Sequence, residues 1–186
     1  MLRLPSDSGL TARRINEKDT AALQALCEAC ADYHTLIEGQ PAGPDEARHL
    51  LALLPPGKTQ EDKFVFGLFT PRPRLCGVLD IARDYREPGE WYLGLLLLEP
   101  GVRGRGLGEQ VLRAAEDWAY SQGARRMRLA CAEQNEAGRR FWERQGYRVD
   151  RVFPPRRMGV RDTVLLELKR ELTGGQAESL SKSSAE

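Results

Sequence analysis

The stretch LLLLEPGVRGRGLGEQVL, residues 95–112, decides how the rest of the chain is interpreted. It begins with an apolar run typical of a buried strand, continues through a turn that carries four glycines and two arginines, and ends where a helical pattern starts. A strand, a glycine-rich turn and a helix in this order aim unpaired backbone N–H groups and the positive end of a helix at one place. The stretch therefore predicts a binding site for an anion.

Three phosphate-binding patterns compete for this turn. The Walker A pattern fails because Leu107 and Gly108 stand where lysine and serine or threonine are required. The dinucleotide pattern G-x-G-x-x-G fails at Glu109, which replaces the third glycine. The pattern R-x-x-G-x-G is complete, with Arg103, Gly106 and Gly108. From the turn alone, an ordinary tight connection between a strand and a helix remains the alternative.

Length and composition indicate one ordinary globular domain. Of the 186 residues, 41% are hydrophobic and 30% are charged, and the formal net charge is +1. This balance gives no electrostatic reason to expect nucleic acid or a membrane as a partner. No apolar run approaches the ~20 residues of a membrane span, and the first residues lack the apolar core of a signal peptide. We therefore expect a cytoplasmic protein.

The four cysteines are Cys27, Cys30, Cys76 and Cys131. Cys27 and Cys30 have the spacing of a redox or zinc pair, but they lie in a helical pattern with no second C-x-x-C. Buried free thiols on one helix are the simpler interpretation, because free cysteine is among the most buried residue types. We expect no metal and no disulfide.

The hydrophobic pattern predicts one core built from strands and helices. We expect one folded domain over residues 10–172, a lead-in over residues 1–9 and a flexible polar tail over residues 173–186. One strand–helix–strand crossover predicts a single parallel pair in a mostly antiparallel sheet, so the fold class is α+β, or mixed α/β. Residues 154–161 are expected to form a loop, and Glu116 and Asp117 to face solvent. Strands are expected at residues 10–15, 63–70, 75–82, 90–98, 125–131, 147–153 and 162–169, and helices at residues 20–36, 45–54, 107–122 and 135–145.

A second motif, NEAGRRFWERQGY at residues 135–147, supports a family resemblance. It is similar to N-x-x-A-x-x-F-Y-x-x-x-G-F, with Gly138, Trp142 and Tyr147 replacing the usual Ala, Tyr and Phe. With the R-x-x-G-x-G turn and the order of elements, it makes the chain resemble the GCN5-related N-acetyltransferase (GNAT) family. The resemblance implies a mixed sheet flanked by about four helices, and an N-acetyltransferase that moves an acetyl group from acetyl-CoA to a primary amine by direct attack on the thioester. The alternative is a non-catalytic acetyl-CoA-binding or sensing module of the same fold.

The resemblance assigns coenzyme A to the stretch quoted first. The pantetheine arm would pair with the strand end as an added strand does, and the pyrophosphate would lie against the N–H groups of the turn. Asn135 would hydrogen-bond the cofactor, and it can also cap the helix that follows it. The expected cofactor-binding residues are Leu96, Leu97, Leu98, Arg103, Gly104, Arg105, Gly106, Leu107, Gly108 and Asn135.

The catalytic groups are less defined by the sequence. A protonated amine must lose a proton before it attacks a thioester, so a carboxylate in the cleft is expected. Glu90, at the start of the central strand, is the first candidate for the general base, and Tyr92, Asp80 and Glu99 are alternatives. A backbone N–H near Leu97 is expected to stabilise the oxyanion.

The acceptor amine stays unidentified, and a homodimer is an open option. In the family, a tyrosine at the position of Trp142 protonates the departing thiolate. Trp142 cannot do so, because its indole N–H donates a hydrogen bond but does not release its proton at a useful pKa. A lone histidine such as His34 is more often a packing residue than a catalyst. The residues expected around the acceptor are of mixed charge: Tyr33, His34, Glu38, Asp80, Tyr85, Arg156, Arg157 and Arg161.

Overall fold

The structure is a computed structural model that describes residues 2–174. The predicted tail lies outside this range from residue 175 onward. The strands are β1 (Thr11–Arg14), β2 (Lys63–Phe69), β3 (Leu75–Ala82), β4 (Glu90–Leu98), β5 (Arg126–Ala132), β6 (Arg148–Val152), β7 (Arg156–Met158), β8 (Arg161–Thr163) and β9 (Leu165–Glu171). The helices are α1 (Thr20–Ala29), α2 (Ala31–Glu38), α3 (Glu46–Ala52), α4 (Leu107–Ser121) and α5 (Glu136–Arg144).

Seven strands form one sheet in the order β1-β2-β3-β4-β5-β9-β6, and β7 and β8 form a separate hairpin. Only β4 and β5 pair in parallel; the other neighbours in the sheet are antiparallel. This arrangement confirms the predicted α+β class with one parallel pair. It also confirms that the crossover connecting that pair is α4, which follows the glycine-rich turn.

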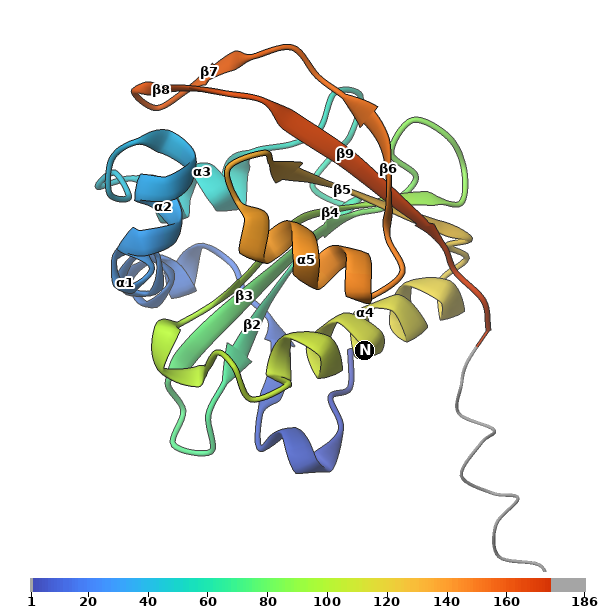
Figure 1. Cartoon of the computed structure of the whole chain (residues 1–186). Coiled ribbons are helices and arrows are strands. Elements are labelled where there is room, and N and C mark those ends of the chain that lie inside the picture. The colour runs from blue at the N-terminus through green and yellow to red at the C-terminus, as the bar shows by residue number, and fades with distance from the viewer. Residues whose placement is uncertain (1, 175–186) are drawn as a thin grey trace, which may run out of the picture.

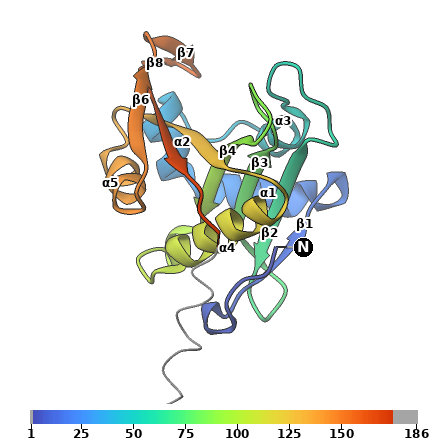
Figure 2. The same cartoon turned by 90° about the vertical axis from the view of Figure 1, so that its right-hand side faces the viewer.

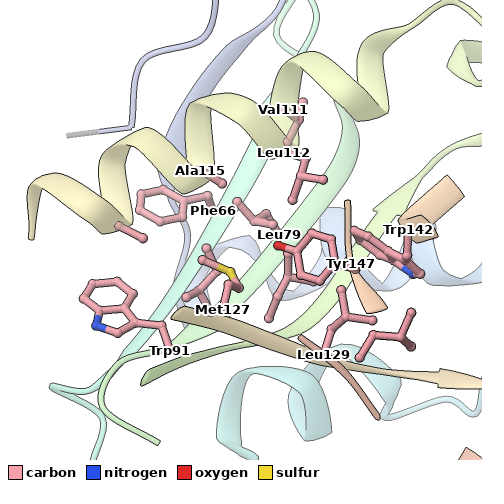
Figure 3. Packing of buried hydrophobic residues seen from close by; sticks show 14 of the residues in the cluster. Phe66, Leu79, Trp91, Val111, Leu112, Ala115, Met127, Leu129, Trp142 and Tyr147 are labelled. Atoms are coloured by element: carbon pink, nitrogen blue, oxygen red, sulfur yellow. The ribbon is translucent and has the colours of Figure 1, made fainter. Parts of the chain in front are cut away.

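Helices cover both faces of the sheet (Figures 1 and 2). On one face, α4 buries Val111, Leu112 and Ala115 against strand residues such as Leu79 and Met127 (Figure 3). A second cluster joins α1 and α3 to side chains of β2, β3 and β4 on the other face. Burying a large aliphatic side chain contributes about 1.5–3 kcal/mol, so the two clusters hold the sheet between the helical layers. Within residues 2–174, no helix is both long and apolar enough to cross a bilayer.

Three predicted elements differ from the structure. The strand expected over residues 162–169 is divided between β8 of the separate hairpin and β9 of the main sheet. The helix expected over residues 20–36 is divided at Cys30, whose φ of −98° and ψ of 34° leave the helical region. The thiol of Cys30 lies 3.5 Å from the carbonyl oxygen of Leu98, so the break keeps α2 close to the end of β4. The predicted loop at residues 154–161 contains β7 and the start of the β7–β8 hairpin, which reaches over α2 (Figure 1).

Glu116 is buried and does not face solvent as predicted, whereas Asp117 is exposed. The Glu116 carboxylate accepts a hydrogen bond from the Tyr147 hydroxyl at 2.8 Å and another from Arg170 at 2.8 Å. The lead-in also contributes to the core, because Leu2 is 2% exposed and packs in the α4-side cluster.

Strands β4 and β5 are paired over only part of their length. The parallel register joins residues 90–93 of β4 to residues 126–129 of β5 and stops there. The β3–β4 register shifts between Asp80 and Ile81, which pair with Leu95 and Leu93 and leave Gly94 without a partner. This β-bulge bends β4 at the point where it leaves β5, because a bulge adds a residue and locally increases twist.

Candidate active site

The space between β4 and β5 opens into a cavity of 1050 Å³. Its walls come from the end of β4, the glycine-rich turn, α2, α3, α5 and the β7–β8 hairpin. The cavity is large enough for a drug-sized ligand and has both apolar and charged walls, as binding sites for small molecules do. Eight of the ten predicted cofactor-binding residues line it: Leu96, Leu97, Leu98, Arg103, Gly104, Gly106, Gly108 and Asn135.

Beyond residue 93, the side of β4 that faces this cavity has no strand partner among residues 2–174. The N–H of Glu99 donates to the carbonyl of Cys76 at 2.9 Å. In an antiparallel pair every second residue bonds to the neighbouring strand, so the N–H and C=O groups of Leu97 also point toward β3, where Leu97 pairs with Val78. By the same alternation, the N–H and C=O groups of Leu96 and Leu98 point away from β3, toward the gap. The geometry therefore places Leu96, and not the predicted Leu97, where a backbone N–H can reach a ligand.

The turn after β4 is shaped for close approach by a ligand. Gly104 and Gly106 have φ values of 75° and 76°, a left-handed conformation that side chains with a Cβ avoid. No side chain caps the first turn of α4. Within residues 2–174, no hydrogen-bond acceptor is recorded for the N–H groups at residues 104–108. These donors and the positive end of α4 give the turn the chemistry that an anion-binding site requires.

The two arginines of the turn have different surroundings. Arg103 donates from Nε to the Leu98 carbonyl at 2.7 Å, and its guanidinium pairs with Asp32 on α2. The hydrogen bond from the Arg103 guanidinium lowers the pKa of the Asp32 carboxyl. Arg103 therefore connects the turn to α2, and it also lines the cavity. Arg105 is exposed and does not line the cavity. Leu107 packs against the core at the start of α4 and also lies outside the lining.

Asn135 caps α5, as its position predicts. Its side-chain oxygen accepts a hydrogen bond from the N–H of Gly138 at 2.9 Å. An added Cβ at residue 138 would lie 2.5 Å from the Asn135 amide nitrogen, so the glycine leaves room for this cap.

Trp142 is only 9% exposed and packs edge-on against Phe141 and Tyr147 while lining the cavity. Tyr147 itself is fully buried.

The four carboxyl and phenol groups considered as a base lie in different places. Glu90 is 3% exposed and does not line the cavity; Arg128 and Arg126 pair with it at 2.7 and 3.2 Å. A carboxylate held between two guanidinium groups, away from the cavity, is poorly placed to take a proton from a substrate. Glu99 also lies outside the lining and pairs with Arg74.

Asp80 and Tyr92 line the cavity. Burial raises the pKa of Tyr92 to about 12, which leaves the phenol protonated at neutral pH. Burial also raises the pKa of Asp80, and Lys63, whose ammonium lies 2.8 Å from the carboxylate, partly opposes that rise. Of the candidates for the base, Asp80 is the carboxylate that lines the cavity, and the direction of its pKa shift favours accepting a proton compared with an ordinary aspartate.

The far wall of the cavity carries His34, Glu38 and Glu46. One ligand atom from each lies within 4.8 Å of the others, so the group could hold a cation. Glu46 and Lys63 were not predicted as site residues. Lys63 begins an apolar strand and Glu46 begins a short amphipathic helix, and neither has a sequence neighbour that indicates a ligand.

Comparison with known proteins agrees with this geometry. A profile of the acetyltransferase (GNAT) family matches residues 23–147, which contain both the glycine-rich turn and the α5 motif. No curated protein sequence matches the chain. Among solved structures, an acetyltransferase from Thermus thermophilus superposes with a TM-score of 0.72 and 26% sequence identity, covering 88% of this chain and 97% of that one.

More distant structures share the fold. Spermidine N-acetyltransferase from Vibrio cholerae, solved with CoA and spermine, gives a TM-score of 0.68 at 13% identity, over 89% of this chain and 96% of that one. A GCN5-related N-acetyltransferase from Kribbella flavida superposes with a TM-score of 0.65 at 20% sequence identity, and the match covers 89% of this chain and 99% of that one. The family profile covers most of the chain and the fold is the same. The chain therefore belongs to the GNAT family of acetyltransferases.

Proposed function

We propose that the protein is an acetyl-CoA-dependent N-acetyltransferase. Family membership supports acetyl transfer in general, and the chain's own geometry supports the cofactor site. The observation that carries the proposal is the early end of the β4–β5 pairing at residue 93. Beyond it, on the β5 side of the strand, the backbone of Leu96 and the N–H of Leu98 have no strand partner among residues 2–174, while the Leu98 carbonyl accepts from Arg103. This edge leads directly to the N–H groups of the turn at residues 104–108.

The free edge and the turn suit the two ends of coenzyme A. The pantetheine arm contains amides, so it can pair with the C=O of Leu96 and the N–H of Leu98 as an added strand does. The pyrophosphate would be held by the N–H groups of the turn at the positive end of α4. A solved relative of the same fold contains CoA, which fits this assignment. Arg103 holds the turn in place through Leu98 and Asp32.

The reaction requires a neutral amine and a stabilised oxyanion. The amine nitrogen attacks the thioester carbon, the carbonyl oxygen takes the negative charge, and the carbon–sulfur bond then breaks to release the CoA thiolate. We assign the oxyanion contact to the backbone N–H of Leu96, the first residue after the bulge whose N–H faces the gap. We assign the proton lost by the amine to Asp80, directly or through one water.

The leaving group needs no strong acid in this scheme. Trp142 occupies the position of the family's usual tyrosine and cannot donate a proton at a useful pKa. A thiol of ordinary pKa near ~8.5 is a good leaving group as its thiolate, so departure without prior protonation is feasible. Trp142 is also the observation that favours the second candidate function, an acetyl-CoA-binding module without turnover.

Calorimetry and a thiol-release assay test the proposal. We expect CoA to bind with one-to-one stoichiometry while ATP and NAD do not, and we expect acetyl-CoA with a panel of amines to release free thiol. Failure of CoA to bind would refute the cofactor assignment. Binding without thiol release across the panel would instead support the non-catalytic module.

Two variants separate the base candidates. Asp80→Asn should lower kcat/KM by roughly 10²–10⁴-fold, the usual contribution of a general base, with the Kd for CoA unchanged. Glu90→Gln should lower thermal stability because it disturbs buried ion pairs, but turnover per folded molecule should stay near that of the parent chain. The reverse pattern would restore Glu90 as the base.

A further inference from the structure

The acceptor half of the cavity contains two carboxylates, Glu38 and Glu46, with which no lysine or arginine of residues 2–174 forms an ion pair. We infer that His34, Glu38 and Glu46 bind the non-reacting ammonium group of the acceptor, so that the acceptor is a diamine or polyamine. This inference rests on the proposed N-acetyltransferase function and names the class of amine that the enzyme uses. It depends on the charge, burial and spacing of these three side chains.

The three side chains converge from two helices. His34 and Glu38 are four residues apart on α2 and therefore lie on one face, with Nδ1 of His34 3.8 Å from a carboxylate oxygen of Glu38. Glu46 comes from the first turn of α3 and completes the group. Within the described range 2–174, no lysine or arginine pairs with Glu38 or Glu46. Two half-buried carboxylates side by side attract a cation, because like charges destabilise each other when nothing neutralises them.

His34 supplies an independent sign of a missing ligand. Its side chain is buried, with 3% exposure of the residue, and it lines the cavity. Neither ring nitrogen has a hydrogen-bond partner in the part of the chain that the structure describes. Buried polar groups are nearly always hydrogen-bonded, so an unpaired imidazole on a cavity wall indicates a ligand that donates to it. An ammonium group carries only donors and fits this requirement.

The surroundings of His34 favour an ammonium group over a metal ion. Three acceptors placed about 2.8 Å from a tetrahedral ammonium nitrogen are roughly 4.6 Å apart, whereas three ligands about 2.1 Å from tetrahedral zinc are roughly 3.4 Å apart. The 3.8 Å between His34 and Glu38 lies between these two values, and the ligand atoms of all three side chains lie within 4.8 Å of one another, so the spacing admits both ligands and the surroundings of His34 decide. A metal-bound histidine also donates its second N–H to the protein, and His34 has no such partner among residues 2–174.

The ammonium held here cannot be the nucleophile. Neighbouring carboxylates favour the charged form of an amine and raise its pKa, which opposes the deprotonation that attack requires. The reacting amine must therefore lie elsewhere, near Asp80, whose charge is balanced by Lys63. The acceptor accordingly needs two amino groups, one held as a cation and one free to lose its proton.

Helix α3 sets the distance between the two positions. The ammonium of Lys63, which pairs with Asp80, also donates to the carbonyl of Leu53 just after α3. Glu46 begins the same helix, and a seven-residue α-helix is about 10 Å long. The two amino groups of the acceptor should therefore be separated by on the order of 10 Å, as in a long diamine or a polyamine.

The β7–β8 hairpin fixes the α2 end of this site. The N–H of Val160 donates to the carbonyl of Glu38 at 2.8 Å, and the side chains of Arg161 and Thr163 donate to the carbonyls of Leu36 and Ile37. These bonds satisfy carbonyl groups that the end of a helix leaves free. They hold Glu38 in position before a ligand arrives, which reduces the entropic cost of binding.

Steady-state kinetics on the full chain test the inference with defined amines. The probes are α,ω-diamines from ethane-1,2-diamine to octane-1,8-diamine, spermidine, the matching alkyl monoamines and free amino acids. We expect kcat/KM to rise with diamine length and to exceed that of the equally long monoamine by at least tenfold. Glu38→Gln and Glu46→Gln should each raise KM for long diamines roughly tenfold to hundredfold, the effect of losing one charge-assisted hydrogen bond, and leave monoamines almost unchanged. Glu61→Gln, at an exposed residue outside the cavity, is the matched control and should change neither.

The possible results distinguish failure of the inference from failure of the proposed function. Equal rates for diamines and monoamines, or a preference for amino acids, would overturn the inference while thiol release confirmed an acetyltransferase. Stoichiometric zinc in the purified protein, lost on His34→Ala, would also overturn it in favour of a metal site. Absence of CoA binding would refute the proposed function itself.

Discussion

The buried hydrogen bond between Tyr147 and Glu116 provides a quantitative test of how the sheet and α4 are held together. Tyr147 is fully buried and Glu116 is 7% exposed. The hydroxyl donates to one carboxylate oxygen at 2.8 Å, and Arg170 donates to the other at 2.8 Å. Tyr147→Phe removes the donor and almost no volume, so the change measures the hydrogen bond with little effect on packing.

The expected loss follows from the charge and burial of the acceptor. A hydrogen bond to a charged group contributes about 1.5–3 kcal/mol, and an unsatisfied buried charge adds to the loss when its donor is removed. Because Arg170 still pairs with the second oxygen, we expect Tyr147→Phe to lower the free energy of unfolding by about 2 kcal/mol. For a domain of this size, that change corresponds to a decrease in Tm of about 4–8 °C.

Urea unfolding and a double-mutant cycle measure this contribution. Glu116→Leu removes the acceptor, and Tyr147→Phe with Glu116→Leu leaves an apolar pair, so the double variant should be more stable than the sum of the single losses by about 1–2 kcal/mol. Tyr120→Phe is the control, because no hydrogen bond of the Tyr120 hydroxyl is recorded among residues 2–174, and it should change stability by less than about 0.5 kcal/mol.

The pH dependence of the stability loss in Tyr147→Phe provides a second check on this explanation. Burial raises the pKa of Glu116, and the Tyr147 hydrogen bond acts in the opposite direction by favouring the ionised carboxylate. The loss in Tyr147→Phe should therefore grow as pH rises through the titration of Glu116 and shrink in acid, where the carboxyl is protonated. A coupling energy below about 0.5 kcal/mol, or a loss that increases in acid, would refute the reasoning.

Three further predictions concern the turn, the base and the acid stability of the fold. Gly106→Val should weaken CoA binding measured by calorimetry at least tenfold, because φ is 76° there, while Gly101→Val, at an exposed position without positive φ, should not. Lys63→Met removes the cation that lowers the pKa of Asp80, so the acid limb of the kcat/KM–pH profile should move to higher pH; an unmoved limb would exclude Asp80 as the titrating group. Basic partners lower the pKa of Asp150 to about 2, so its stabilising contribution, present above ~3.9, should be lost as pH falls toward 2, and Asp150→Asn should reduce that part of the acid-unfolding curve.

The elements around the glycine-rich turn could be predicted from the sequence because several local signals agree there. Strands β3 and β4 match their predicted ranges to the residue, and α4 begins directly after the turn as expected. Apolar runs bounded by turn residues, followed by a strong helical period, leave few alternative registers. The family resemblance rested on the same stretch and was confirmed by the profile match.

The errors arise where distant contacts decide local structure. Apolar spacing continues through Cys30, so no local pattern indicates that the helix is interrupted beside Leu98. The residues at 154–161 include two prolines and three arginines, which are typical of a loop in isolation. They form a hairpin because the carbonyl groups at the end of α2 accept its hydrogen bonds, and the sequence spacing between these segments is more than 120 residues.

The base candidates show the same limit within the site. Glu90 precedes the binding stretch, which suggested a catalytic role, but its environment is set by Arg126 and Arg128 from the neighbouring strand. Asp80 lies on β3, and only the register of the sheet reveals that it faces Gly94 across the bulge. A sequence pattern can locate groups that act through the local backbone, whereas groups that act across strands require the pairing to be known.

The bulge at Gly94 lies between the proposed cofactor site on β4 and Asp80, the proposed base. It stands where β4 stops pairing with β5, and an added Cβ at this residue would lie 3.2 Å from a carboxylate oxygen of Asp80. A side chain there would crowd the Asp80 carboxylate and its partner Lys63, so a glycine is the residue that keeps this space open. In the proposed reaction, the same irregularity would free the Leu96 backbone for the thioester and leave room beside Asp80 for the attacking amine. Since both consequences follow from one unpaired residue, the sheet would set the position of the attacking amine relative to the thioester, while Glu38 and Glu46 would hold only the second amino group of the acceptor.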